Sequence, residues 1–86
     1  RSLNMRLDKY LKVSRIIKRR TVANEACDAG RVVVNGKIAR ASYDVKVNDV
    51  IELTLGARTV KARVVSVNEY AKKDEAAMMY EIIEEK

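Results

Sequence analysis

The dipeptide Asn35-Gly36, which lies between two short apolar runs, is the feature that most restricts how this chain can fold. A type I′ turn needs a positive φ at both central residues, and Asn-Gly adopts that conformation readily. The sequence therefore predicts a hairpin that joins Val32–Val34 to residues 37–39. In that register Arg31 would face Arg40, and like charges so placed destabilise a sheet. We expect either that the strands end before these two residues or that a phosphate binds between them.

Residues 6–13, ahead of the hairpin, have the spacing of an amphipathic helix that ends near Ser14. The apolar side chains of this segment fall within about 100° of arc: Leu7, Tyr10 and Leu11. Basic side chains occupy the opposite face. Asp8 lies in the first turn, where a carboxylate complements the helix dipole, and four residues before Lys12. We therefore expect Asp8 to form an ion pair with Lys12.

A second helix is expected between this segment and the hairpin. Thr21 is its expected N-cap, and Gly30 stands where a residue in the left-handed conformation commonly ends a helix. The apolar side of this helix carries mostly small side chains: Val22, Ala23, Ala26, Cys27 and Ala29. Because small side chains let two elements approach closely, we expect this helix to pack tightly against its neighbours.

Alternating apolar residues predict two more strands, at 50–55 and 59–67, with a hairpin turn at residues 56–58 between them. Residues 72–79 are expected to form a short helix. Residues 80–83 fit either a final strand or a continuation of that helix, and the sequence does not decide between the two.

The predicted fold class is α+β, with two or three short helices packed on a small, strongly twisted antiparallel sheet. We expect one domain over residues 5–86, because a chain of 86 residues has room for one modest core. Its central part would be residues 5–53, followed by the second hairpin and a short helix or strand in residues 54–86. Residues 1–4, ahead of Met5, are interpreted as a cloning remnant.

Positive charge is concentrated in one half of the chain. The first forty residues contain eleven Lys or Arg and three acids, a net charge of +8, whereas the other forty-six contain seven and nine, a net charge of −2. This asymmetry predicts an anionic partner. Nucleic acid is favoured over an acidic membrane, because no segment combines a basic face with bulky apolar side chains suited to a bilayer surface.

The remaining composition argues against chemistry and for binding. The chain has no His and a single Cys, which makes a dedicated zinc site or a Cys-His nucleophile implausible. No glycine-rich phosphate loop is present, and no cofactor is predicted. Cys27 is interpreted as a core thiol. A lone Cys agrees with a reducing compartment, and the sequence shows no secretory signal and no apolar run of membrane-spanning length, so we expect a cytoplasmic protein.

Ten basic residues of the amino-terminal half are the candidate RNA contacts. Three lie on the first helix, four in the hinge that follows it, and three around the hairpin: Arg6, Lys9, Lys12, Arg15, Lys18, Arg19, Arg20, Arg31, Lys37 and Arg40. A solvated basic face is the simpler interpretation of the helix residues alone. Because the hinge and the hairpin add cations in the same half, RNA contact is favoured.

Several spaced motifs together resemble the S4 RNA-binding domain over about residues 5–53. They are Arg-Leu-Asp-Lys-Tyr-Leu at 6–11, Ser-Arg at 14–15, Arg-Arg-Thr at 19–21, Ala26, Gly-Arg-Val at 30–32, Val-Asn-Gly at 34–36 and Val-Lys-Val before Asp49. One departure is Val47-Asn48, where the family commonly has Pro-Gly. Asn48 can still adopt a left-handed turn, so the same fold is expected.

Within this family the chain is most similar to the small proteins that act at the P site in ribosome-associated quality control. The resemblance implies binding to 23S rRNA and P-site tRNA on obstructed large ribosomal subunits. It also implies support for C-terminal alanine tailing of stalled nascent chains, beside a factor of the RqcH type, and a monomer off the ribosome. By family position, Arg6 and Arg20 become the strongest candidate contacts.

Two alternatives remain. One is a large-subunit recycling factor of the heat-shock type, which shares the domain but tends to carry a basic C-terminal extension. The other is a fragment of an RNA-modifying enzyme, because pseudouridine synthases hold their essential Asp in an Arg-Leu-Asp motif and often carry an S4 domain. Here that triplet, Arg6-Leu7-Asp8, opens an amphipathic helix and no catalytic domain follows it, so a non-enzymatic protein is predicted.

Overall fold

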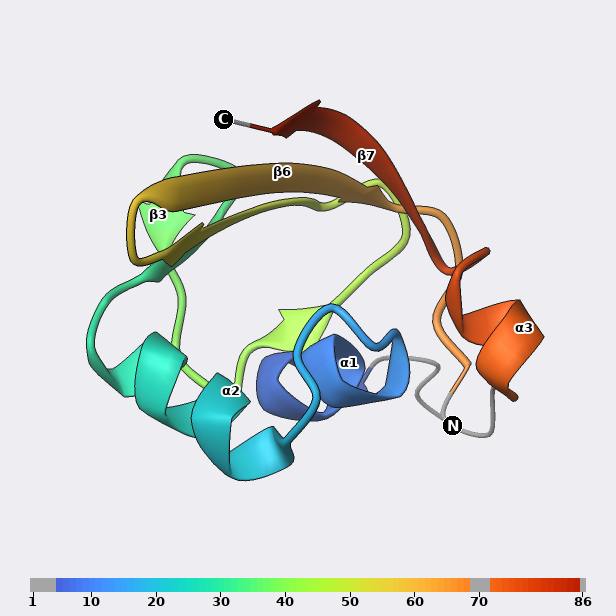
Figure 1. The fold of residues 1–86 in the computed structure, drawn as a ribbon, viewed down its shortest axis with the longest axis horizontal. Coiled ribbons are helices and arrows are strands. Elements are labelled where there is room, and N and C mark those ends of the chain that lie inside the picture. The colour runs from blue at the N-terminus through green and yellow to red at the C-terminus, as the bar shows by residue number, and fades with distance from the viewer. Residues whose placement is uncertain (1–4, 69–71, 86) are drawn as a thin grey trace.

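Figure 1 shows a computed structural model of the chain, in which residues 5–68 and 72–85 are described and a curved antiparallel sheet arches over two helices. The elements in chain order are β1 (Met5–Arg6), α1 (Leu7–Val13), α2 (Arg20–Asp28), β2 (Val32–Val34), β3 (Lys37–Ile38), β4 (Asp44–Val45), β5 (Val50–Leu55), β6 (Arg58–Val64), α3 (Lys73–Ala76) and β7 (Tyr80–Glu85). The main sheet has the order β3-β2-β5-β6-β7, and β1 pairs with β4. The predicted α+β class is confirmed, while the proposed cloning remnant lies outside the described residues.

Helix α1 forms the centre of the core. Leu7, Tyr10 and Leu11 are fully buried, as their helical spacing predicts, and burying each such side chain is worth about 1.5–3 kcal/mol. The Tyr10 hydroxyl donates a hydrogen bond of 2.8 Å to the backbone carbonyl of Met79, so its polar end is satisfied inside the core. The helix ends as expected, with Ser14 as its C-cap. Packing on α1 therefore joins the first helix to the segment that precedes β7.

Helix α2 starts two residues earlier than the sequence indicates, so the prediction of Thr21 as its N-cap is wrong. Arg19 is the N-cap, with an extended backbone, and its carbonyl accepts a hydrogen bond from the Ala23 amide. No side chain caps this end. An ion pair between Arg20 and Asp8 of α1 holds Arg20 in the first turn, which accounts for the earlier start.

The far end of α2 is closed by Gly30, as predicted. Gly30 has φ +73°, its amide bonds to the Cys27 carbonyl and the Arg31 amide bonds to the Ala26 carbonyl. These two bonds define a Schellman motif. On the apolar side of the helix Ala23, Ala26 and Cys27 are buried, but Val22 and Ala29 are exposed. The face that packs is therefore narrower than the sequence indicates.

The hairpin at Asn35-Gly36 is confirmed. Both residues have positive φ, 53° and 85°, as a type I′ turn requires. The two strands end before Arg31 and Arg40, which is the first of the two expected solutions to their like charges. Arg31 leaves the ladder because its amide closes the end of α2.

The second half of the sheet follows the predicted alternation with two changes of boundary. Strand β6 begins at Arg58 and ends at Val64, after which the amides of Val65 and Ser66 bond to the Met79 carbonyl. Helix α3 covers four residues, fewer than predicted. Residues 80–85 form a strand, β7, antiparallel to β6. Because this segment pairs with β6, it is a final strand and not a continuation of the preceding helix, the two possibilities that the sequence leaves open.

Asp49 is a buried carboxylate that fixes the loop following the hairpin. Asp49 accepts hydrogen bonds from Asn35 Nδ2 at 3.0 Å, from the Tyr43 hydroxyl at 2.9 Å and from the Lys46 amide at 2.9 Å. Burial and the bond to Asp49 raise the pKa of Tyr43 above its ordinary value. Asn48 has φ 79°, the left-handed turn expected there. The hairpin turn, residues 39–43 and the start of β5 are thereby held together.

The buried hydroxyl of Tyr10 yields a stability prediction. Tyr10→Phe removes its bond and leaves the Met79 carbonyl without that donor, so the free energy of unfolding should fall by about 1 kcal/mol. Urea denaturation followed by circular dichroism measures it, with an unchanged m value. The control is Tyr80→Phe, because the half-buried Tyr80 hydroxyl makes no hydrogen bond to another described residue. Equal losses in the two variants would contradict the assignment.

Candidate nucleic-acid interface

Asp8 of α1 is the centre around which the basic side chains are arranged. It is 2 % exposed, and its carboxylate accepts hydrogen bonds from Arg6 Nε at 3.2 Å, Arg20 Nε at 3.3 Å and Asn24 Nδ2 at 3.3 Å. Arg6 Nη2 adds a bond at 3.4 Å, and the backbone amide of Lys9 adds another at 2.8 Å. The side chains of Arg6 and Arg20 are 50 % and 49 % exposed. Two arginines from separate segments are thus fixed on their inner side and open on their outer side.

The charge of Asp8 is stable in this setting. Burial raises the pKa of its carboxyl, but the hydrogen bonds from Arg20, Asn24 and Arg6 together hold the pKa below its ordinary value. The carboxylate therefore remains ionised at neutral pH and keeps both guanidinium groups oriented. Because a guanidinium carries five N–H donors in a planar fork, each arginine retains donors for a phosphate.

The ion pair expected between Asp8 and Lys12 is not formed; within residues 5–68 and 72–85, Asp8 pairs with Arg6 and Arg20. The physical reason is the position of Asp8, which faces α2 in the interior, whereas Lys12 is exposed. Asp8 is an ion-pair residue as predicted, with other partners.

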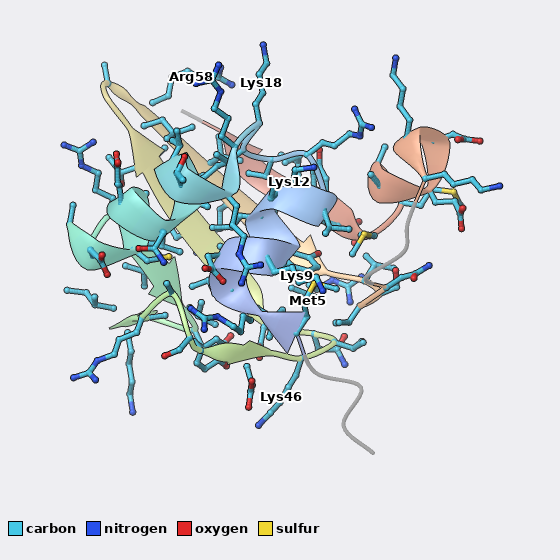
Figure 2. All side chains as sticks on the ribbon, turned by 90° about the horizontal axis from the view of Figure 1, so that it is seen from below. Met5, Lys9, Lys12, Lys18, Lys46 and Arg58 are labelled. Atoms are coloured by element: carbon cyan, nitrogen blue, oxygen red, sulfur yellow. The ribbon has the colours of Figure 1, made fainter. Side chains whose placement is uncertain are left out.

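The other cations of α1 and of the hinge lie on the helix side of the molecule. Figure 2 views this side and shows Lys18, Lys12 and Lys9 one after another across it. Lys12 and Lys18 are exposed and Lys9 is half-buried. Arg15, also exposed, has φ 66° at the end of α1, and the exposed Arg19 precedes α2. Lys9, Lys12 and Lys18 therefore form a row of cations on the helix side.

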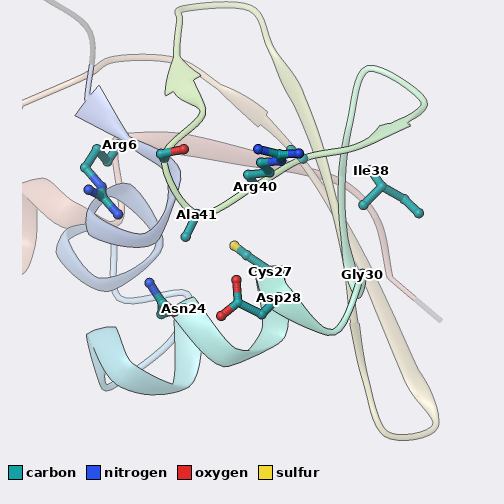
Figure 3. A pocket seen from close by; sticks show the side chains of 10 residues that line it. Arg6, Asn24, Cys27, Asp28, Gly30, Ile38, Arg40 and Ala41 are labelled. Atoms are coloured by element: carbon teal, nitrogen blue, oxygen red, sulfur yellow. The ribbon is translucent and has the colours of Figure 1, made fainter.

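The three candidate cations around the hairpin do not all lie together. Arg40 shares with Arg6 a hollow of about 530 Å³ between α2 and residues 39–42, which Figure 3 shows from close by. Arg40 and Lys37 also line a neighbouring hollow of about 620 Å³. Arg31 is exposed in the link between α2 and β2, and none of these contacts includes it. Arg6 and Arg20 therefore share Asp8 as a partner, and Arg6 and Arg40 line the same hollow, whereas Arg31 takes part in neither arrangement.

Two further cations, which sequence reasoning missed, lie among the labelled residues of the helix side: Lys46 and Arg58 (Figure 2). Arg58 is directly opposite Leu55 in the β5–β6 ladder, and Leu55 is on the same face as the buried Leu53. That face is the one that covers the helices. The alternation in β5, combined with a turn at Gly56-Ala57, was the signal that could have assigned Arg58 to it.

Other kinds of chemistry receive no support from the described residues. No group of three or more Cys, Asp or Glu within residues 5–68 and 72–85 could hold a metal ion. Burial, and then the charges of Asp8 and Asp28, raise the pKa of Cys27 to about 11, so its thiol stays protonated. Cys27 is 4 % exposed, which confirms it as a core thiol. None of the described helices is both long and apolar enough to cross a membrane.

Comparisons with known proteins agree with this geometry. Residues 5–51 match the family model of the S4 domain. The chain is 57 % identical over 81 residues to the RQC P-site tRNA stabilizing factor of Streptococcus pneumoniae, covering 94 % of this chain and 92 % of that protein. It is 51 % identical over 81 residues to the Bacillus subtilis protein of the same name, covering 94 % of this chain and 94 % of that one.

A solved structure, the trimeric heat shock protein 15 of Vibrio cholerae, superposes with a TM-score of 0.84 at 28 % identity, covering 92 % of this chain and 81 % of that one. The resemblance noted in the sequence is confirmed over its whole predicted extent apart from the last two residues, 52 and 53. The chain belongs to the S4 domain family and, within it, to the family of the RQC P-site tRNA stabilizing factors.

Proposed function

We propose that this protein binds structured RNA on the large ribosomal subunit and stabilises P-site tRNA on subunits obstructed by peptidyl-tRNA. The observation that carries the proposal is the pair of half-exposed arginines, Arg6 and Arg20, held by the buried Asp8 in a molecule whose helix side carries Lys9, Lys12 and Lys18. The name shared by relatives that are 57 % and 51 % identical supports the P-site role.

Binding of this kind depends on shape and charge. An RNA duplex exposes phosphates and 2′-hydroxyls more readily than base edges, so a rigid cationic surface can recognise its form without reading its sequence. Affinity then comes mainly from phosphate neutralisation and counterion release. Under this proposal the protein acts by binding, which the relatives' name, a tRNA stabilizing factor, supports.

The partners that the proposal assigns are 23S rRNA and the tRNA, contacted in the cytoplasm by a protein that is monomeric off the ribosome. By holding that tRNA, the protein would support alanine tailing of the nascent chain beside a factor of the RqcH type. Cations around the hairpin, Lys37 and Arg40, face another hollow than the one beside Arg20, which suits contact with two RNA elements at once.

A second candidate is a recycling factor of the heat-shock type, which the structural match to heat shock protein 15 favours. The two functions differ in their consequence for the tRNA. A stabilising factor should increase retention of P-site tRNA and alanine tailing on purified obstructed subunits, whereas a recycling factor should leave tailing unchanged. Altered nucleosides in rRNA after incubation with the protein would instead indicate an RNA-modifying enzyme.

The function itself predicts where the protein migrates. Full-length tagged protein, captured from lysate and resolved on a sucrose gradient, should co-migrate with free large subunits that bear peptidyl-tRNA. Northern blotting for tRNA in the same fractions measures the second component. Migration with small subunits would contradict the proposal and point to a role in assembly.

Arg20 should contribute more than its charge. Arg20→Ala should weaken binding to large subunits. A plot of log K against log salt should have a slope of about −4 to −5 if about six cations engage phosphates, and in this variant the slope should be less steep by about 0.7–0.9. Arg20→Lys should recover little, because a lysine cannot hold Asp8 and a phosphate with one planar fork. Filter binding across a salt series measures both. Arg63→Ala is the control, since Arg63 pairs with Glu81.

The role of Asp8 predicts that removing its negative charge weakens binding to the subunit, which is the opposite of what the change in net charge alone would predict. Asp8→Asn adds one unit of positive charge to a phosphate-binding surface, yet affinity for the subunit should fall about 5-fold or more, the equivalent of about 1 kcal/mol, because Arg6 and Arg20 lose the partner that orients them. Asp74→Asn on α3 makes the same charge change away from α1 and should leave affinity within twofold. Tighter binding by Asp8→Asn would contradict this role.

A further inference from the structure

The hollow beside Arg6 has a form that phosphate binding alone does not explain. Its volume of about 530 Å³ lies within the range of roughly 300–1,000 Å³ typical of small-molecule sites. Its lining includes the small apolar side chains of Cys27, Ala39 and Ala41, which are 4 %, 6 % and 6 % exposed. Buried small residues at this place leave room above them, so the hollow can accept a flat apolar body.

The two walls of this hollow carry opposite charges. Arg6 and Arg40 lie on the side of residues 39–42, and Asn24 and Asp28 lie on α2, as Figure 3 shows. A free phosphate would be attracted by the arginines and repelled by the carboxylate. A ligand that suits both walls needs an anionic part for one side and N–H donors for the other.

Asp28 occupies a position that the fold alone does not favour. It is the last residue of α2, where the negative end of the helix dipole disfavours an acid. Its side chain is exposed and forms no ion pair or hydrogen bond with another residue in the part of the chain that the structure describes. A carboxylate that stabilises nothing around it, beside a hollow, is available to a ligand.

We infer that this hollow binds one unstacked RNA nucleotide, and guanine in preference to uracil. The inference rests on the proposed function and gives it a second kind of contact. The phosphates of the nucleotide would pair with Arg6 and Arg40, and the base would lie over Cys27, Ala39 and Ala41. The Asp28 carboxylate would accept hydrogen bonds from the base.

The preference follows from the donors on each base edge. Guanine presents two adjacent N–H groups, at N1 and N2, which match the two oxygens of one carboxylate. Uracil presents a single N–H between two carbonyl oxygens, and those oxygens would repel Asp28. RNA-binding proteins commonly read bases in this way when the bases are unpaired and turned out of a helix.

The test uses the full-length protein and a short RNA hairpin in four forms: fully paired, and with a single bulged G, a single bulged U or a single abasic bulge. Fluorescence anisotropy at one fixed salt concentration measures each affinity. The bulged G should bind at least about 5-fold more tightly than the bulged U, the lower end of what one matched base contact contributes. Equal affinity for bulged G and bulged U would overturn the inference.

Asp28→Ala separates the two kinds of contact. It should abolish the preference for G while leaving affinity for the fully paired hairpin unchanged or higher, because it removes a negative charge. Glu25→Ala, which removes the same charge from the same helix at a residue that does not line this hollow, should keep the preference. A preference that persists in Asp28→Ala would overturn the assignment of Asp28.

Folding is not expected to interfere with this test. Asp28→Ala should not lower the melting temperature, because the substitution removes an acid from the C-terminal end of α2. If the wild type co-migrates with large subunits yet shows no discrimination among bulges, the inference fails and the proposed function stands. If it binds neither subunits nor any hairpin, both fail.

Discussion

Asp8 is a buried charge, and the interior of a protein tolerates such a charge only when it is paired and hydrogen-bonded. Arg6, from the strand before α1, and Arg20, from the first turn of α2, meet that need from two directions. The same interaction therefore joins the two helices and orients the cations that face solvent. Because the contact between the two helices and the orientation of Arg6 and Arg20 depend on one group, a change at Asp8 should affect both.

Asp49 is the other buried carboxylate among the described residues, and it too is fully occupied by hydrogen-bond donors. By accepting bonds from Asn35, Tyr43 and the Lys46 amide, it ties the hairpin turn to Tyr43 and to the loop that precedes β5. The loop that carries Arg40 is tied to the start of α1 by two backbone hydrogen bonds, from the Leu7 amide to the Tyr43 carbonyl and from the Asp8 amide to the Ala41 carbonyl. Among the cations, Asp8 fixes Arg6 and Arg20 directly, so these two long side chains have a defined orientation before RNA binds.

Local signals predicted the parts of the fold that local interactions determine. The turn at Asn35-Gly36 and the spacing of Leu7, Tyr10 and Leu11 depend on neighbours along the chain, and both are confirmed. The partner of Asp8 could not be found in that way. Lys12 is near in sequence, but Arg20 becomes near only after α2 folds against α1. The face of Arg58 likewise depends on the register of β5 and β6.

The distribution of charge over the sheet explains why one side alone should meet RNA. On the face away from the helices, Arg63 pairs with Glu81, and Lys61 lies between Glu52 and Glu84 in the ladder. Those cations are largely compensated, whereas Lys9, Lys12, Lys18 and Arg58 lie on the helix side. A net charge of +6 therefore understates the positive charge on that side, which under the proposed function would approach the phosphates first.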